Sequence, residues 1–189
     1  PTAMWWLQLD SPGVLAAGWI LLIGWMIFSQ TAATSLALEG TSFYILKAAP
    51  VSARQVLRAK TVSILVPYAI VATALLIASW VVLQYSLLWT PYAWICLLLM
   101  GSGMLGFTTA MGFPWVNLKW EDPRRMNRGR GSLYGMIGVA VYLIISAPIA
   151  LIPFVVSLAA PVWTPLAVVL GLAAIFGITW ALWTFAVRQ

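Results

Sequence analysis

The residues with the most recognisable spacing are Gly101, Gly103 and Gly106, which match the dinucleotide-binding fingerprint G-x-G-x-x-G. Glu121 follows Gly101 by 20 residues, where that fingerprint places an acidic residue on the ribose. The fingerprint requires a strand, a tight turn and the start of a helix, with the glycines facing phosphate in water. Here the glycines lie in the apolar stretch 92–111, which indicates one membrane helix. We therefore expect them to allow close helix packing and not to bind a nucleotide.

The reactive side chains are too few for most enzymes. The chain has no histidine, one cysteine and four acidic residues. A zinc site needs a cluster of His, Cys and carboxylates, and serine hydrolysis needs a general base. Glu121 and Asp122 are adjacent acids, but they precede Pro123, which is typical of a turn at the membrane surface. We expect no catalytic residue, no metal site and no cofactor.

The sequence also lacks an ATP site of the P-loop type. The motif G-x-x-x-x-G-K-[ST] has a glycine before its lysine. The residues before the three lysines are Leu46, Ala59 and Leu118. If ATP drives this protein, we expect another chain to hydrolyse it.

The elements that would position any site are membrane helices. Of the 189 residues, 63% are hydrophobic and 7% are charged, whereas soluble domains have about 25% charged residues. Three uncharged runs, 11–38, 61–118 and 131–187, are long enough for one, two and two membrane crossings. Breaks rich in proline and aromatic residues divide the two longer runs. We predict an all-α polytopic membrane helix bundle of about five transmembrane helices, at about 12–36, 61–88, 92–115, 133–157 and 165–187.

The basic residues orient these spans. All ten lysines and arginines fall on one side, in segment 37–60, in loop 116–132 and at Arg188. Because basic residues are retained in the cytoplasm, we expect this side to be cytoplasmic and the N-terminus of the chain to lie outside the plasma (inner) membrane. Attraction to anionic lipid explains the net charge of +6, so we expect no nucleic-acid partner. Since Pro1 starts outside without a signal peptide, we expect the chain to be the C-terminal part of a longer protein.

Segment 37–60 is a candidate interaction site because it is longer than a simple turn between two spans. Pro50 ends a first short element, and Ser52 with Gln55 forms a capping-box pattern that starts a second. We expect two short amphipathic helices on the membrane surface, joined at Pro50 as a cytoplasmic elbow. Anchoring in the headgroups would alone account for the basic residues that end this segment, although it would not explain the segment's length.

These residues carry a family resemblance. The runs Leu36–Gly40, Lys47–Ser52 and Leu57–Lys60 are similar to the cytoplasmic elbow of permease subunits of bacterial ABC-type exporters. The loop 112–131 resembles a Pro-rich, acidic loop of the same proteins. The remaining spans match only as generic membrane helices.

The resemblance implies a permease subunit that moves a substrate with ATP hydrolysed by a separate cytoplasmic ATP-binding-cassette ATPase subunit. It also implies a homo- or heterodimer of permeases surrounded by membrane lipid. In such transporters, short cytoplasmic helices pass the movement of the ATPase to the spans, because packed helices move as bodies. The predicted ATPase-coupling residues are Glu39, Gly40, Phe43, Tyr44, Lys47, Pro50, Ser52, Arg54, Gln55 and Arg58.

Other functions fit the same spans. A channel or a secondary carrier is the main alternative, since membrane spans alone do not distinguish these classes. Carriers that couple to ions usually hold ionisable residues within the membrane, and the five predicted spans contain none. A membrane-embedded enzyme is less favoured because of the missing catalytic inventory. A structural or assembly subunit is the last alternative, and the sequence does not indicate a substrate.

Overall fold

The computed structural model describes residues 11–35, 52–84, 89–112 and 130–188. These residues form five long helices: α1 (Ser11–Thr34), α3 (Ala53–Leu83), α4 (Thr90–Gly112), α5 (Arg130–Ala159) and α6 (Thr164–Arg188). A short 3-10 helix, η3 (Pro161–Trp163), connects α5 to α6. The described ranges contain no strand. Each long helix is long and apolar enough to cross a membrane, so the predicted all-α membrane helix bundle is confirmed.

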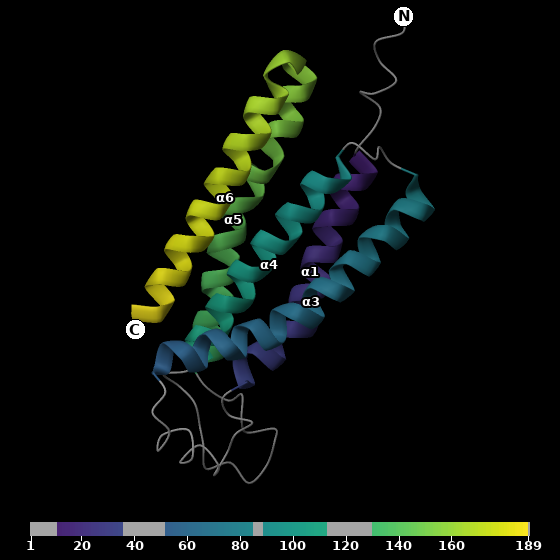
Figure 1. Cartoon of the computed structure of the whole chain (residues 1–189). Coiled ribbons are helices and arrows are strands. Elements are labelled where there is room, and N and C mark those ends of the chain that lie inside the picture. Colours follow the sequence, from purple (N-terminus) through teal and green to yellow (C-terminus); the bar gives the residue numbers. More distant parts are fainter. Residues whose placement is uncertain (1–10, 36–51, 85–88, 113–129, 189) are drawn as a thin grey trace, which may run out of the picture.

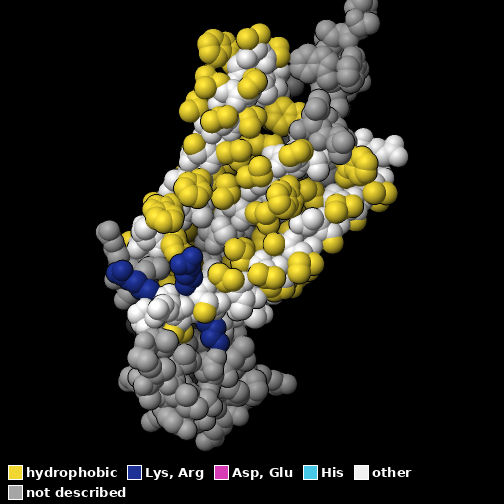
Figure 2. All heavy atoms as spheres, in the orientation of Figure 1, with side chains coloured by type: hydrophobic (Ala, Val, Ile, Leu, Met, Phe, Trp, Pro, Cys, Tyr) yellow, Lys and Arg dark blue, Asp and Glu magenta, His cyan; other side chains and the backbone are white. Residues whose placement is uncertain are grey.

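Successive helices run in opposite directions (Figure 1). The C-terminal ends of α1, α4 and α6 and the N-terminal ends of α3 and α5 therefore lie toward the lower end of the bundle in that view. The described basic residues belong to these helix ends: Arg54, Arg58 and Lys60 in α3, Arg130 in α5 and Arg188 in α6. Figure 2 shows the Lys and Arg side chains in view near the lower end, below a surface that is mostly apolar. We refer to this end as the basic end.

α4 is the central helix of the bundle. It contacts α1 and α3 on one side and α5 and α6 on the other (Figure 1), whereas α1 and α5 hardly touch each other. The membrane-crossing part of α4 is 67% buried, compared with 28% in α3 and 11% in α6. Most of α4 therefore faces protein, and the outer helices face the surroundings.

Large apolar side chains cover the outside of the bundle. Trp19 of α1, Ile70 of α3 and Ile144 of α5 are 64%, 66% and 73% exposed. A contiguous apolar surface of this kind is unfavourable in water, whereas in a bilayer it faces lipid tails. Since every backbone polar group within a helix is already hydrogen-bonded, such a bundle is suited to the hydrocarbon region.

The start of α3 differs from the predicted elbow. We expect from the sequence a short surface helix followed by a span that starts at residue 61, but one uninterrupted helix runs from Ala53 to Leu83. Its buried side chains form a single stripe along the helix: Leu57, Thr61, Ile64, Tyr68, Ala72 and Leu76. No glycine or proline occurs between Ser52 and Pro67 to interrupt this stripe, so the helix has no physical reason to end at the membrane surface.

Candidate functional site

An apolar cavity of about 230 Å³ lies between α1, α4 and α5. Its walls come from the N-terminal halves of α1 and α4 and from the C-terminal half of α5, so it lies in the half of the bundle away from the basic end. Gly18 and Leu21 of α1, Cys96 and Met100 of α4, and Ala147 and Leu151 of α5 are among the residues that line it. None of the described residues on its walls is charged.

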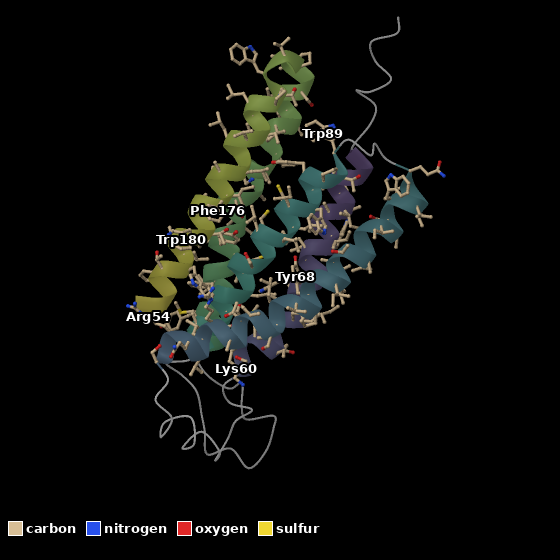
Figure 3. All side chains as sticks on the ribbon, viewed as in Figure 1. Arg54, Lys60, Tyr68, Trp89, Phe176 and Trp180 are labelled. Carbon is tan, nitrogen blue, oxygen red and sulfur yellow. The ribbon has the colours of Figure 1, made fainter. Side chains whose placement is uncertain are left out.

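Three aromatic side chains gather at the end of the cavity that lies farthest from the basic end. The ring of Trp89 packs edge-on against the rings of Tyr92, with centroids 5.9 Å apart, and Phe154, with centroids 6.0 Å apart. Figure 3 shows Trp89 at the opposite end of the bundle from Arg54 and Lys60. Edge-to-face packing at these distances is favourable, and Trp and Tyr are enriched at the membrane–water interface. We call Trp89, Tyr92 and Phe154 the aromatic cluster.

Tyr92 also connects α4 to α5 beside the cavity. Its hydroxyl donates a hydrogen bond of 2.8 Å to the carbonyl oxygen of Ala150. This part of α5 contains Pro148 and Pro153, and each proline removes a backbone N–H from the helix. On the side of α6, a Cβ added at Gly171 would lie 3.2 Å from the ring of Pro153. The proline-containing wall of the cavity is thus held by α4 and closely packed by α6.

Two further tyrosines connect neighbouring helices in the core. Tyr68 of α3 donates a hydrogen bond of 3.1 Å to the carbonyl oxygen of Leu97 in α4. Tyr142 of α5 shares a hydrogen bond of 2.8 Å with the hydroxyl of Thr179 in α6. Both tyrosines are buried, where an unpaired hydroxyl would cost free energy. Together with Tyr92, they link α3 to α4, α4 to α5 and α5 to α6.

The glycines of the G-x-G-x-x-G sequence lie in the middle of α4 and form no phosphate-binding loop. A Cβ at Gly101 would overlap the ring of Tyr68, and a Cβ at Gly103 would lie 2.7 Å from the hydroxyl oxygen of Tyr142. A Cβ at Gly106 would similarly meet an indole ring of α6 at 2.7 Å. The predicted packing role is confirmed, and the close neighbours are aromatic rings of three other residues.

The structure describes four of the predicted coupling residues. Glu39, Gly40, Phe43, Tyr44, Lys47 and Pro50 lie outside the described residues. The predicted capping box is present: the Ser52 N–H donates to Gln55 Oε1 at 2.8 Å, and the Gln55 N–H donates to Ser52 Oγ at 3.3 Å. Arg54 and Arg58 are exposed on the first turns of α3, at the end of the bundle opposite the cavity. The coupling role of these residues stays a prediction.

The fold and the cavity define a polytopic, all-α membrane protein. The chain belongs to the family described as "Putative ATP-binding cassette", whose model matches residues 14–186. No curated protein and no solved structure matches the chain.

The family assignment corrects two expectations. Its description names an ATP-binding cassette and not a permease, so the prediction of a permease subunit of an ABC-type exporter is wrong. The prediction that the chain is not an enzyme, with ATP hydrolysed by a separate ATPase partner, is contradicted by the same description. The resemblance rested on two cytoplasmic segments, most of which lie outside the described residues, whereas the family model matches across all five helices.

The described helices do not by themselves fit ATP. A P-loop needs a strand followed by a glycine-rich turn into a helix, and the described ranges contain no strand. The four acidic residues, which could hold Mg²⁺, all lie outside those ranges. The described walls of the cavity have no charged side chain to balance a triphosphate. The cavity is therefore suited to an apolar molecule and not to a nucleotide.

Proposed function

We propose that this chain is a membrane-embedded component of an ATP-binding-cassette transport complex. The family assignment connects it to ATP-binding cassettes, and the five long apolar helices supply the membrane part. One observation carries the proposal: α1 and α5 both border the apolar cavity but hardly touch each other. The cavity can therefore change width without separating a packed helix pair.

The contacts of α4 support such a movement. α1 packs with α3 and α5 packs with α6, and both pairs contact α4. Few side-chain hydrogen bonds of the described residues join α4 to these pairs: Tyr68 and the Trp94–Thr73 bond connect it to α3, and Tyr92 connects it to α5. Small sliding and rotation of packed helices is a common form of conformational change. A shift of one pair across α4 would widen or narrow the cavity.

We further propose that the basic end faces the cytoplasm of a plasma (inner) membrane and that the start of α1 faces outside. All described lysines and arginines lie at the ends of helices that meet at the basic end, and basic residues are retained in the cytoplasm. The position of Trp89 at the opposite end (Figure 3) fits the second membrane–water interface.

The test is a nucleotide-dependent change in the width of the cavity. Gly18 on α1 and Leu151 on α5 both line the cavity and are both exposed. Cysteines introduced at these two positions, in a Cys96→Ala background, report the distance between the walls through their rate of crosslinking by a short bismaleimide. In native membrane vesicles, we expect ATP with Mg²⁺ to change this rate about threefold or more, since a ligand that favours one state shifts the population.

A second cysteine pair serves as the control. Tyr142 and Thr179 are hydrogen-bonded within the α5–α6 pair, which stays intact in the proposed movement, so cysteines at these positions should crosslink equally fast with and without ATP. Equal rates for the pair at positions 18 and 151 in the two conditions would contradict the proposal.

A further inference from the structure

The cavity extends along the helices that line it. It follows α1 from Gly13 to Leu21, which is roughly 12 Å of helix at the α-helical rise. Its volume is about 230 Å³. Since non-bonded carbon atoms pack about 4 Å apart, this length and volume leave room for at least one extended hydrocarbon chain.

The walls select for an apolar occupant. They consist of glycine, aliphatic and aromatic side chains, with the single thiol of Cys96. The hydroxyl of Tyr92 is already used in its hydrogen bond to Ala150, so it does not call for a polar ligand. Apolar cavities of this kind stay dry and bind apolar molecules.

The cavity is accessible from the membrane. Gly18 and Leu151, on two helices that hardly touch, are wall residues that are also exposed on the surface of the bundle. In a bilayer, the molecules that lie against this surface are lipid tails. At one end, the cavity meets the aromatic cluster, and Trp and Tyr lie at the level of the lipid headgroups.

We propose that the cavity binds one acyl chain of a bilayer phospholipid, with the headgroup at the end marked by Trp89. The chain enters between α1 and α5 and lies along α4. This inference goes beyond the proposed function because it concerns the protein without nucleotide, whether or not the lipid is moved.

Two glycines offer a matched pair of variants. A Cβ at Gly18 would meet nothing within 4 Å, and the same holds for Gly177 of α6. Both residues are exposed, but only Gly18 lines the cavity. Gly18→Leu should therefore narrow the cavity, since its Cβ can be added without a clash, while Gly177→Leu adds the same side chain to a helix face elsewhere. Ala93→Leu, on the α4 wall, is a second variant that fills the cavity.

The experiment uses phosphatidylcholine vesicles that contain the purified protein and a small fraction of phosphatidylcholine with a photoactivatable diazirine on one acyl chain. After illumination, mass spectrometry locates the labelled peptides. We expect the label to concentrate on the cavity walls, within 13–21, 89–100 and 147–154. Gly18→Leu and Ala93→Leu should each reduce this label about fivefold or more, as expected for a loss of binding free energy. Gly177→Leu should leave it unchanged.

Three results would overturn the proposal. The first is label spread evenly over all outward-facing helices of the wild-type protein. The second is unchanged label on the cavity walls in both cavity-filling variants, each shown to be folded by circular dichroism. The third is unlabelled walls together with crosslinks between two copies of the chain, which would mean that a second copy fills the cavity. Because no nucleotide is present, the result is separate from the ATP response of the crosslinked pair at positions 18 and 151.

Discussion

The hydroxyl of Tyr68 on α3 donates a hydrogen bond of 3.1 Å to the carbonyl oxygen of Leu97 on α4. The aromatic ring of Tyr68 lies against Gly24 of α1 and Gly101 of α4. A Cβ added at either glycine would overlap this ring. The ring of Phe28 in α1 packs against it edge-on, with centroids 6.0 Å apart. One buried side chain, labelled in Figure 3, therefore joins three helices.

Gly101→Ala should destabilise the bundle because its Cβ would overlap the ring of Tyr68, which is 1% exposed and has no space to move into. Overpacking of this kind costs about 1–3 kcal/mol. The measurement is the free energy of unfolding in mixed detergent micelles. Gly177→Ala is the control, since a Cβ there meets nothing within 4 Å. Equal stability of the two variants would show that Gly101 has no such packing role.

The bond between Tyr142 and Thr179 should give a measurable coupling energy. Their oxygens are 2.8 Å apart and join α5 to α6. A double-mutant cycle with Tyr142→Phe and Thr179→Val isolates this bond from the loss of other contacts. Hydrogen bonds between membrane helices contribute about 0.6 kcal/mol on average, with a maximum near 1.7. A coupling energy of zero within error would contradict the prediction.

Ser52→Ala should loosen the first turn of α3. The Ser52 side chain accepts a hydrogen bond from the Gln55 N–H, and loss of such a cap costs about 0.5–2 kcal/mol. We expect faster hydrogen exchange at residues 53–57. Ser63→Ala is the control, because the Ser63 hydroxyl donates to the Lys60 carbonyl oxygen and caps no N–H. If both substitutions had the same effect on the first turn, the cap would have no special role.

Gln84→Gly should stabilise the end of α3. Gln84 has φ 46° and ψ 38°, in the left-handed region, where a side chain costs roughly 1–2 kcal/mol and glycine does not. We expect a higher midpoint of thermal unfolding for Gln84→Gly. Gln84→Ala keeps the Cβ and should give no comparable gain. A lower midpoint for the glycine variant would mean that the Gln84 side chain makes a stabilising contact that outweighs the strain.

Cysteine labelling tests the proposed orientation. In a Cys96→Ala background, Val162→Cys places a thiol on η3, where the native side chain is 87% exposed, and Ser52→Cys places one at the exposed start of α3. In intact cells, a membrane-impermeant maleimide should modify only the cysteine at position 162. The cysteine at position 52 should react only after permeabilisation. The reverse pattern would invert the orientation.

The features predicted from the sequence are those that depend on residues close together in the chain. A membrane crossing needs about 20 apolar residues, so the uncharged runs predict five helices. The Ser52–Gln55 cap depends on two residues three positions apart and was predictable for the same reason. The continuity of α3 was not predicted. Leu57 was assigned to the surface elbow and Ile64 to the membrane span, although both belong to one buried stripe of a single helix.

The cavity had no signal in the sequence. It exists because α1 and α5 stay apart while both border the space beside α4, and no local pattern records a distance between helices that are far apart in the chain. The bond from Tyr92 to Ala150 is similar, since its acceptor is a backbone carbonyl that any residue supplies. The family was misassigned because the resemblance rested on two cytoplasmic segments, whereas the family model matches across all five helices.

The central position of α4 sets the order in which the bundle can be assembled. α4 is synthesised after α1 and α3 but before α5 and α6, and chains are made from the N-terminus. When α4 enters the bilayer, the rings of Tyr142 and Trp183 that will cover Gly103 and Gly106 have not yet been made. The glycine face of α4 is then open to lipid, and of the described helices only α1 and α3 can yet pack against α4. Native packing of α4 is reached only after α6 has been inserted.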